Sequence, residues 1–133
     1  MARVDHWPEL LADYIAAADK KPFVWGASDC LCFALRWHKI ATGIDREAEH
    51  GAIRWRTKRA AYARLKRMGC ANLSDLGRLI FGNEARPAQL GRGDIAVTQQ
   101  DSFGIVIGTQ VIAAGDGRLV ALPLLDCKTG FRI

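Results

Sequence analysis

The pattern of apolar and polar residues changes about two thirds of the way along the chain. Before Gly91, apolar residues recur three or four positions apart, which is the spacing of one face of an α-helix. This spacing predicts helices over residues 5–20, 30–42, 53–68 and 74–81, with a polar and irregular segment over residues 44–52. The second helix is apolar on nearly every side and ends at Gly43, so we expect it to lie at the centre of the protein.

From Gly91 onward, glycines separate short segments that are rich in β-branched residues, a pattern typical of strands. The segments predict strands over residues 95–98, 105–107, 111–114 and 119–122, with a hairpin turn at residues 115–117. Four short strands joined by tight turns form an antiparallel meander. Helices followed by a small sheet predict an α+β fold, in one domain that spans residues 1–133.

A cysteine lies at the expected start of the second helix. Gly26 allows a tight turn, Ser28 and Asp29 can cap the free helix amides, and Cys30 then falls in the first helical turn. The positive end of the helix dipole favours the thiolate, which is the nucleophilic form of cysteine. The alternative is that Cys30 is a small apolar residue buried in the core, the usual place of a free cysteine.

Composition excludes several classes of protein. Half of the 133 residues are apolar and a quarter are charged, so a largely disordered chain is excluded, and no apolar run is long enough to span a membrane. The first residues carry charged and aromatic side chains where a secretory signal needs an apolar run, so we expect synthesis in the cytoplasm without a signal peptide. The four cysteines have no paired metal-ligand spacing, and we expect no metal and no cofactor.

The predicted third helix is strongly basic. The chain has a net charge of +5, and seven of the fourteen residues from Arg54 to Arg67 are basic. Such a face is a docking surface for a polyanion, a docking surface for another protein, or a solvated helix face. Nucleic acid is not expected because no recognised nucleic-acid motif accompanies the charge. The seven residues of this basic docking face are Arg54, Arg56, Lys58, Arg59, Arg64, Lys66 and Arg67.

Three motifs follow one another in the chain: Phe-x-Trp-Gly-x-x-Asp-Cys over residues 23–30, Gly-Asp-Ile-Ala-Val over residues 93–97, and Phe-Gly-Ile-Val-Ile-Gly over residues 103–108. Their order and spacing resemble the NlpC-type cell-wall cysteine peptidases, which have a papain-like fold, and in particular the divergent NlpC-like proteins encoded in phage tail modules. The resemblance covers residues 20–125. It implies a cysteine-bearing helix packed on the sheet, with Cys30 at the nucleophile position beside Asp29. The cleft-lining residues that it implies are Trp25, Gly26, Asp94 and Phe103.

The resemblance also implies a histidine at the start of the strand that follows residue 101, but this sequence has Ser102 and Phe103 there. Amide cleavage needs a base and then an acid, and serine does not titrate near neutral pH. Asp94 and Asp101 could orient a partner, yet neither carboxyl replaces an imidazole at pH 7. The catalytic set is therefore incomplete.

The three histidines, His6, His38 and His50, all precede the predicted sheet. His38 follows Cys30 by eight residues on one helix, which places it roughly 12 Å away, too far to act as a base. His50 lies in the irregular segment, and its approach to Cys30 would depend on a chance arrangement of that loop.

Two functions follow from these observations. The first is a tail-tip or tail-assembly protein of a phage or prophage, built on a peptidase fold that has lost its chemistry, present in the virion tail and bound to other tail-tip or hub proteins. The alternative is an active virion-associated peptidoglycan hydrolase, a cysteine endopeptidase or amidase that uses Cys30 as nucleophile. The missing histidine favours the first. A cytosolic thiol hydrolase unrelated to phages has little support in the sequence.

Overall fold

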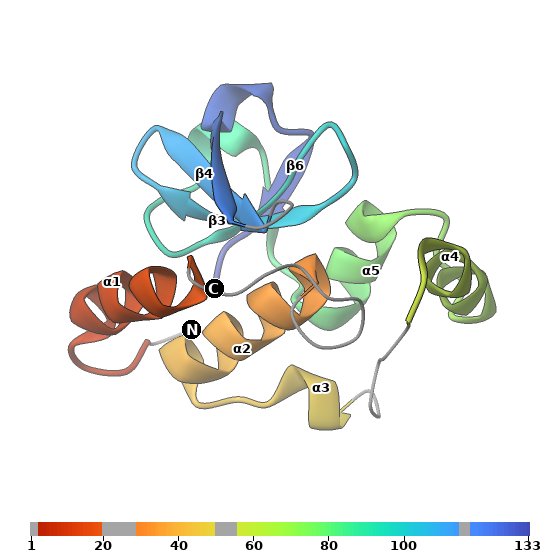
Figure 1. Ribbon diagram of the computed structural model, residues 1–133, viewed down its shortest axis with the longest axis horizontal. Coiled ribbons are helices and arrows are strands. Elements are labelled where there is room, and N and C mark those ends of the chain that lie inside the picture. The colour runs from red at the N-terminus through yellow and green to blue at the C-terminus, as the bar shows by residue number, and fades with distance from the viewer. Residues whose placement is uncertain (1–2, 20–28, 50–55, 115–117) are drawn as a thin grey trace.

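Helices occupy the first part of the chain and strands the rest, in an α+β architecture (Figure 1). The computed structural model describes residues 3–19, 29–49, 56–114 and 118–133. The helices are α1 (Trp7–Ala18), α2 (Cys30–Thr42), α3 (Arg46–Glu49), α4 (Lys58–Arg67) and α5 (Leu73–Ile80). Within those ranges, none of the helices combines the length and the apolar character that crossing a membrane requires.

The sheet has six strands in the order β1-β6-β2-β3-β4-β5, and every neighbouring pair is antiparallel. The strands are β1 (Glu84–Ala85), β2 (Ile95–Val97), β3 (Phe103–Ile107), β4 (Gln110–Ala114), β5 (Leu119–Pro123) and β6 (Thr129–Phe131). The predicted meander is confirmed as β2 to β5. The sequence did not predict β1 and β6, which extend the sheet beyond β2.

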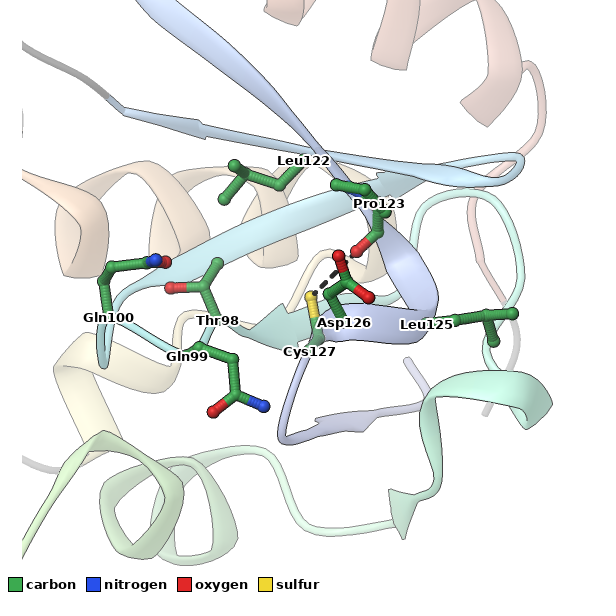
Figure 2. Close-up of a pocket in the computed structure, with 8 residues that line it drawn as sticks. All are labelled: Thr98, Gln99, Gln100, Leu122, Pro123, Leu125, Asp126 and Cys127. Atoms are coloured by element: carbon green, nitrogen blue, oxygen red, sulfur yellow. Dashed lines mark hydrogen bonds between the residues drawn. The ribbon is translucent and has the colours of Figure 1, made fainter.

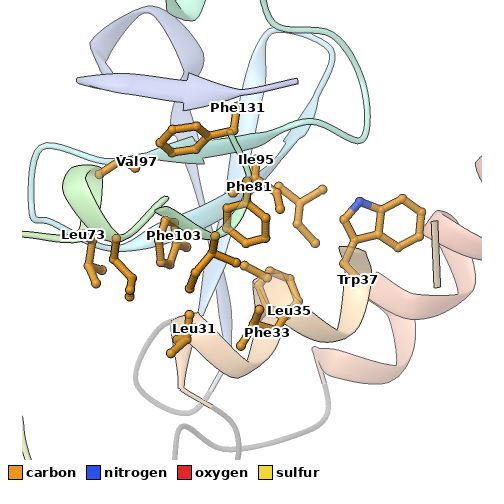
Figure 3. Close-up of a cluster of buried hydrophobic side chains, with 14 of the residues drawn as sticks. Leu31, Phe33, Leu35, Trp37, Leu73, Phe81, Ile95, Val97, Phe103 and Phe131 are labelled. Carbon is orange, nitrogen blue, oxygen red and sulfur yellow. The ribbon is translucent and has the colours of Figure 1, made fainter. Parts of the chain in front are cut away.

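One face of the sheet packs on the helices, and α2 contacts it most closely (Figures 1 and 3). Phe81, which follows α5, lies edge-to-face with Phe103 at a ring separation of 5.8 Å and contacts Phe131 at 6.0 Å. The buried Trp37 Nε1 donates a hydrogen bond to the Gly93 carbonyl at 2.8 Å, which fixes α2 to the turn before β2. These contacts confirm that α2 is a central helix.

The opposite face of the sheet is also covered. Ala96 and Val106 point to this side and pack with Leu90 and Leu124, next to the short 3₁₀ helices η1 (Pro87–Gln89) and η2 (Leu124–Asp126). Because both faces are buried, β2 and most of β3 are apolar at consecutive positions rather than alternating.

Side-chain caps set helix boundaries that differ from the expected ones. Thr57 Oγ1 accepts a hydrogen bond from the Ala60 amide at 3.0 Å, so α4 begins at Lys58. The start of the predicted helix, residues 53–55, lies outside the described residues. Residues 44–52 were expected to be irregular, but Asp45 Oδ1 accepts the Ala48 amide at 3.1 Å and α3 begins after it. The predicted hairpin turn at residues 115–117 lies outside the described residues.

The two ends of the described chain meet at Asp94. Arg3 Nη2 donates to Asp94 Oδ1 at 2.7 Å, and Arg3 Nε donates to the Ile133 carbonyl at 3.0 Å. Asp94 Oδ1 also accepts the Ile133 amide at 3.1 Å, and its Oδ2 accepts the Gly91 amide at 2.8 Å. We call this group the terminal clasp: Arg3, Asp94 and Ile133. It joins the segment before α1 to the residues that follow β6.

Candidate functional site

Cys30 is the first residue of α2, as the sequence predicts. Asp29 is the N-cap, and its Oδ1 accepts a hydrogen bond from the Cys32 amide at 2.9 Å, so the predicted cap is confirmed. Asp29 is almost fully buried, and its charge therefore acts on the thiol through protein rather than through water. The local sequence thus gives Cys30 a helix N-terminus and an adjacent carboxylate.

The surroundings of the Cys30 thiol disfavour its ionised form. Although the residue is partly exposed, burial raises the pKa of the thiol to about 12. A hydrogen bond from the Phe103 backbone lowers the pKa, whereas the charges of Asp29 and Asp101 raise it further. From the sequence, we expect the helix dipole to favour the thiolate. Burial and the two carboxylates act in the opposite direction and favour the neutral thiol. These pKa shifts lie in the direction expected of a buried cysteine, which is the alternative to the nucleophile.

A pocket of about 250 Å³ opens beside Cys30. The turn between β2 and β3 contributes Gln100, Asp101 and Ser102 to its lining. Cys30 and Ser102 thus line one pocket although 72 positions separate them in the sequence, so the structure brings together the predicted nucleophile position and the expected histidine position. No histidine is among the described residues that line this pocket.

The β2–β3 turn is fixed by its own hydrogen bonds. The Thr98 amide donates to the Ser102 carbonyl at 2.8 Å, and the hydroxyls of Thr98 and Ser102 lie 3.0 Å apart. Asp101 has a left-handed backbone with φ of 58°, and its Oδ1 accepts the Leu73 amide at 3.0 Å. Asp101 therefore connects this turn to the start of α5, and its side chain is already engaged beside Cys30.

Two of the predicted cleft-lining residues lie elsewhere. The Phe103 side chain is fully buried in the core against Phe81, because β3 directs it toward the helices, and its backbone forms a hydrogen bond with the Cys30 thiol. Asp94 is buried in the terminal clasp and does not line the Cys30 pocket. Trp25 and Gly26 lie outside the described residues.

The histidines that the structure describes are away from the pocket. His6 precedes α1 and is exposed, with a φ of 60°. His38 is buried in the second half of α2, where its Nδ1 lies 3.3 Å from Thr42 Oγ1 and its ring packs on Phe81 at 5.3 Å. His50 lies outside the described residues. The geometry of His38 agrees with the expectation that it is not a base for Cys30.

Helix α4 forms a second wall of the pocket, which the sequence did not predict. Its Lys58 lines the pocket together with Tyr62 and the apolar Ala61 and Leu65. Five of the predicted basic residues are exposed: Arg56, Lys58, Arg59, Lys66 and Arg67. Arg64 is half-buried, and Arg54 lies outside the described residues.

A second pocket, of about 480 Å³, is lined by Thr98, Gln99 and Gln100 of the β2–β3 turn and by residues around η2 (Figure 2). Gln100 lines both pockets, while Leu122, Pro123 and Leu125 form the far side of the second one. Leu125 is 74 % exposed, the largest exposed fraction among the described large apolar residues. This pocket contains none of the predicted site residues. Across the described ranges, no group of three or more histidines, cysteines or acids has the arrangement of a metal site.

Comparison with known proteins gives one match. A family model described as "Domain of unknown function (DUF6950)" matches residues 2–133. Neither the search of curated proteins nor the search of solved structures gives a match. Because the family model covers almost the whole sequence, the chain belongs to the DUF6950 family.

Proposed function

We propose that this protein is a tail-tip or tail-assembly component of a phage or prophage, built on an NlpC-like, papain-like fold that no longer cleaves peptide bonds. Its partners in this proposal are other tail-tip or hub proteins. The order of the motifs around Cys30, Asp94 and Phe103 supports the family resemblance. A cysteine-bearing helix packed on an antiparallel sheet is in accord with it.

The observation that carries the proposal is the surroundings of the Cys30 thiol. Its pKa is raised to about 12 by burial, and it shares its pocket with Asp101 and Ser102. A thiol of this kind is protonated at neutral pH and is a poor nucleophile. Neither a serine hydroxyl nor an ionised carboxylate donates a proton to a leaving amine at pH 7. Among the described residues that line the pocket, none supplies the proton transfers that peptide cleavage needs, which supports the proposal.

The loss of chemistry is tested by alkylating the folded protein with iodoacetamide and following each cysteine by mass spectrometry. We expect Cys30 at about pH 7.5 to react more slowly than in unfolded protein by a factor on the order of 100 or more, because few thiols are ionised. Cys127, which is buried and also has a raised pKa, shows in the same sample how slowly a buried thiol with no predicted role reacts. Rapid labelling of Cys30 at about pH 6 would contradict the proposal, because it requires a stabilised thiolate.

The alternative, a working peptidoglycan hydrolase, is tested on purified cell walls. We expect the wild-type protein and Cys30→Ala to release new amino termini at the same background rate. Release by the wild type that disappears in Cys30→Ala but persists in Cys127→Ala would establish the hydrolase. His50→Ala then shows whether the histidine outside the described residues supplies the base.

The location is tested on particles made from a genome that encodes this chain. An antibody against the protein, viewed by electron microscopy with gold labelling, should mark the tail end of intact particles. Purified particles that contain no copy of the chain would remove the tail assignment, whatever the reactivity of Cys30.

A further inference from the structure

One face of α4 belongs to the Cys30 pocket. Lys58, Ala61, Tyr62 and Leu65 all line it, and their spacing of three and four residues makes them neighbours on one side of the helix. They share this lining with Cys30 and with Gln100, Asp101 and Ser102 of the β2–β3 turn. Helix α4 lies at the outer end of the molecule in Figure 1, so this wall has one side in the pocket and the other in solvent.

Cations border this face and are not neutralised. At about 100° per residue, Arg59 and Lys66 lie within roughly 60° of Tyr62, whereas Arg67 lies about 180° from Lys58 on the far side of the helix. Lys58, Arg59 and Lys66 are exposed and form no ion pair within the described ranges. Three like charges without counter-charges produce a positive potential at the edge of the pocket.

The interior of the pocket is mostly apolar. Ala61, Leu65, Leu73 and Ala114 contribute to its lining, and Tyr62 at its edge is 44 % exposed. Its volume of about 250 Å³ is below the range of roughly 300–1,000 Å³ typical of small-molecule sites. A pocket of this size and character suits one large apolar side chain.

We propose that the pocket and its cationic border bind an acidic segment of a partner protein. One apolar side chain of that segment enters the pocket beside Cys30, and carboxylates next to it contact Lys58, Arg59 and Lys66. The inference rests on the proposed function and deepens it, since a site without peptide-cleaving chemistry is free to hold a permanent partner. The partner segment would therefore be acidic and carry one apolar side chain that anchors it in the pocket.

The pocket favours a protein segment over a nucleic acid. The cations border the pocket on a single helix of ten residues, about 15 Å long, which is shorter than the track that a nucleic-acid backbone follows. A peptide segment with one apolar side chain between carboxylates complements both the apolar interior of the pocket and the cations at its border.

The test uses a capped, fluorescein-labelled octapeptide of glutamates with one central phenylalanine, and fluorescence anisotropy at low ionic strength. We expect binding by the wild type, and affinity weaker by about tenfold or more in the triple variant Lys58→Glu, Arg59→Glu, Lys66→Glu. Arg67→Glu is the matched control, since it makes the same change on the far side of α4, and it should shift the affinity by less than about twofold. Circular dichroism checks that each variant is folded.

The apolar anchor is tested by replacing the central phenylalanine of the peptide with glycine, which should weaken binding about tenfold. Equal affinity of the two peptides, or equal effects of Arg67→Glu and the triple variant, would overturn the proposal in favour of non-specific charge attraction. Tighter binding of a single-stranded oligonucleotide of the same charge would overturn it in favour of a nucleic-acid site. An octapeptide that does not bind the wild type would also overturn it.

The same samples separate this inference from the proposed function. Mass spectrometry of the octapeptide after incubation reports cleavage. Cleavage that depends on Cys30 would remove the proposed function, whereas loss of binding without cleavage removes only the docking site.

Discussion

A buried thiol changes how the stability of a protein depends on pH. Cys30 has a pKa of about 12 in the folded protein, compared with about 8.5 for an ordinary cysteine in an unfolded chain. Because the folded pKa is the higher one, the stabilisation is fully present below about pH 8.5 and is lost as the pH rises toward 12. Tyr14, Cys70 and Cys127 have raised pKa values as well and act in the same direction.

Cys30→Ala should therefore flatten the alkaline loss of stability. We expect the slope of the free energy of unfolding against pH, between about pH 9 and 10.5, to be smaller than that of the wild type by up to about 1.4 kcal/mol per pH unit. Urea unfolding in reducing buffer at several pH values measures it. Parallel slopes in the two proteins would mean that the thiol titrates alike in the folded and unfolded states.

Residues that act on their immediate neighbours could be predicted from the sequence. The cap at Asp29 and the helical start at Cys30 depend on adjacent residues, and the structure confirms both. Asp94 was predicted to line the cleft, but its role depends on Arg3, which is 91 positions away. The wall that Lys58 adds to the pocket likewise comes from packing that no local pattern encodes.

Helix α5 meets β6 at a glycine. A Cβ at Gly77 would overlap Cε2 and Cζ of Phe131, whose ring is fully buried in the core. Alanine would ordinarily favour a helix over glycine by about 1 kcal/mol. The close approach of α5 to the sheet reverses that preference.

Gly77→Ala should thus destabilise the protein, by about 1–3 kcal/mol, because the core is overpacked at this contact. Chemical denaturation gives the magnitude. In a Phe131→Leu background the same substitution should cost less, because the ring is gone, and a double-mutant cycle isolates this coupling. If the two substitutions change the free energy of unfolding additively, the contact between residue 77 and the Phe131 ring is not the cause of the destabilisation.

The elements that the sequence predicted well are those with a long local pattern. The apolar run of α2 and the four strands of the meander were recognisable on their own. Strand β1 has two residues and β6 has three, one of which is Gly130, so neither has a periodicity of its own. They are strands because Phe131 pairs with both Glu84 and Ile95, a match that depends on the completed sheet.

At the scale of the whole molecule, the terminal clasp links the segment before α1 to the sheet. Arg3 and Asp94 expose only 13 % and 7 % of their side chains, so their ion pair is largely removed from water. The Arg3 guanidinium also lies 4.2 Å from the centre of the Trp7 ring. Removing one partner of such a pair leaves the other charge buried and uncompensated.

Arg3→Ala should lower the free energy of unfolding by about 3 kcal/mol, close to the usual cost of breaking a buried ion pair. Thermal denaturation followed by circular dichroism measures the loss. Arg92→Ala is the control, because Arg92 is exposed and contributes only its backbone carbonyl to Arg3. A loss no larger than that of the control would show that the N-terminal segment adds little to the fold.

The position of β6 between β1 and β2 has a consequence for synthesis on the ribosome. Until Phe131 has left the exit tunnel, β1 has no strand partner and one edge of β2 stays unpaired, since both pair with β6. The nascent chain therefore carries an open sheet edge until almost all of the described sequence has emerged. Chaperone capture during translation is expected to fall only when the last strand is inserted.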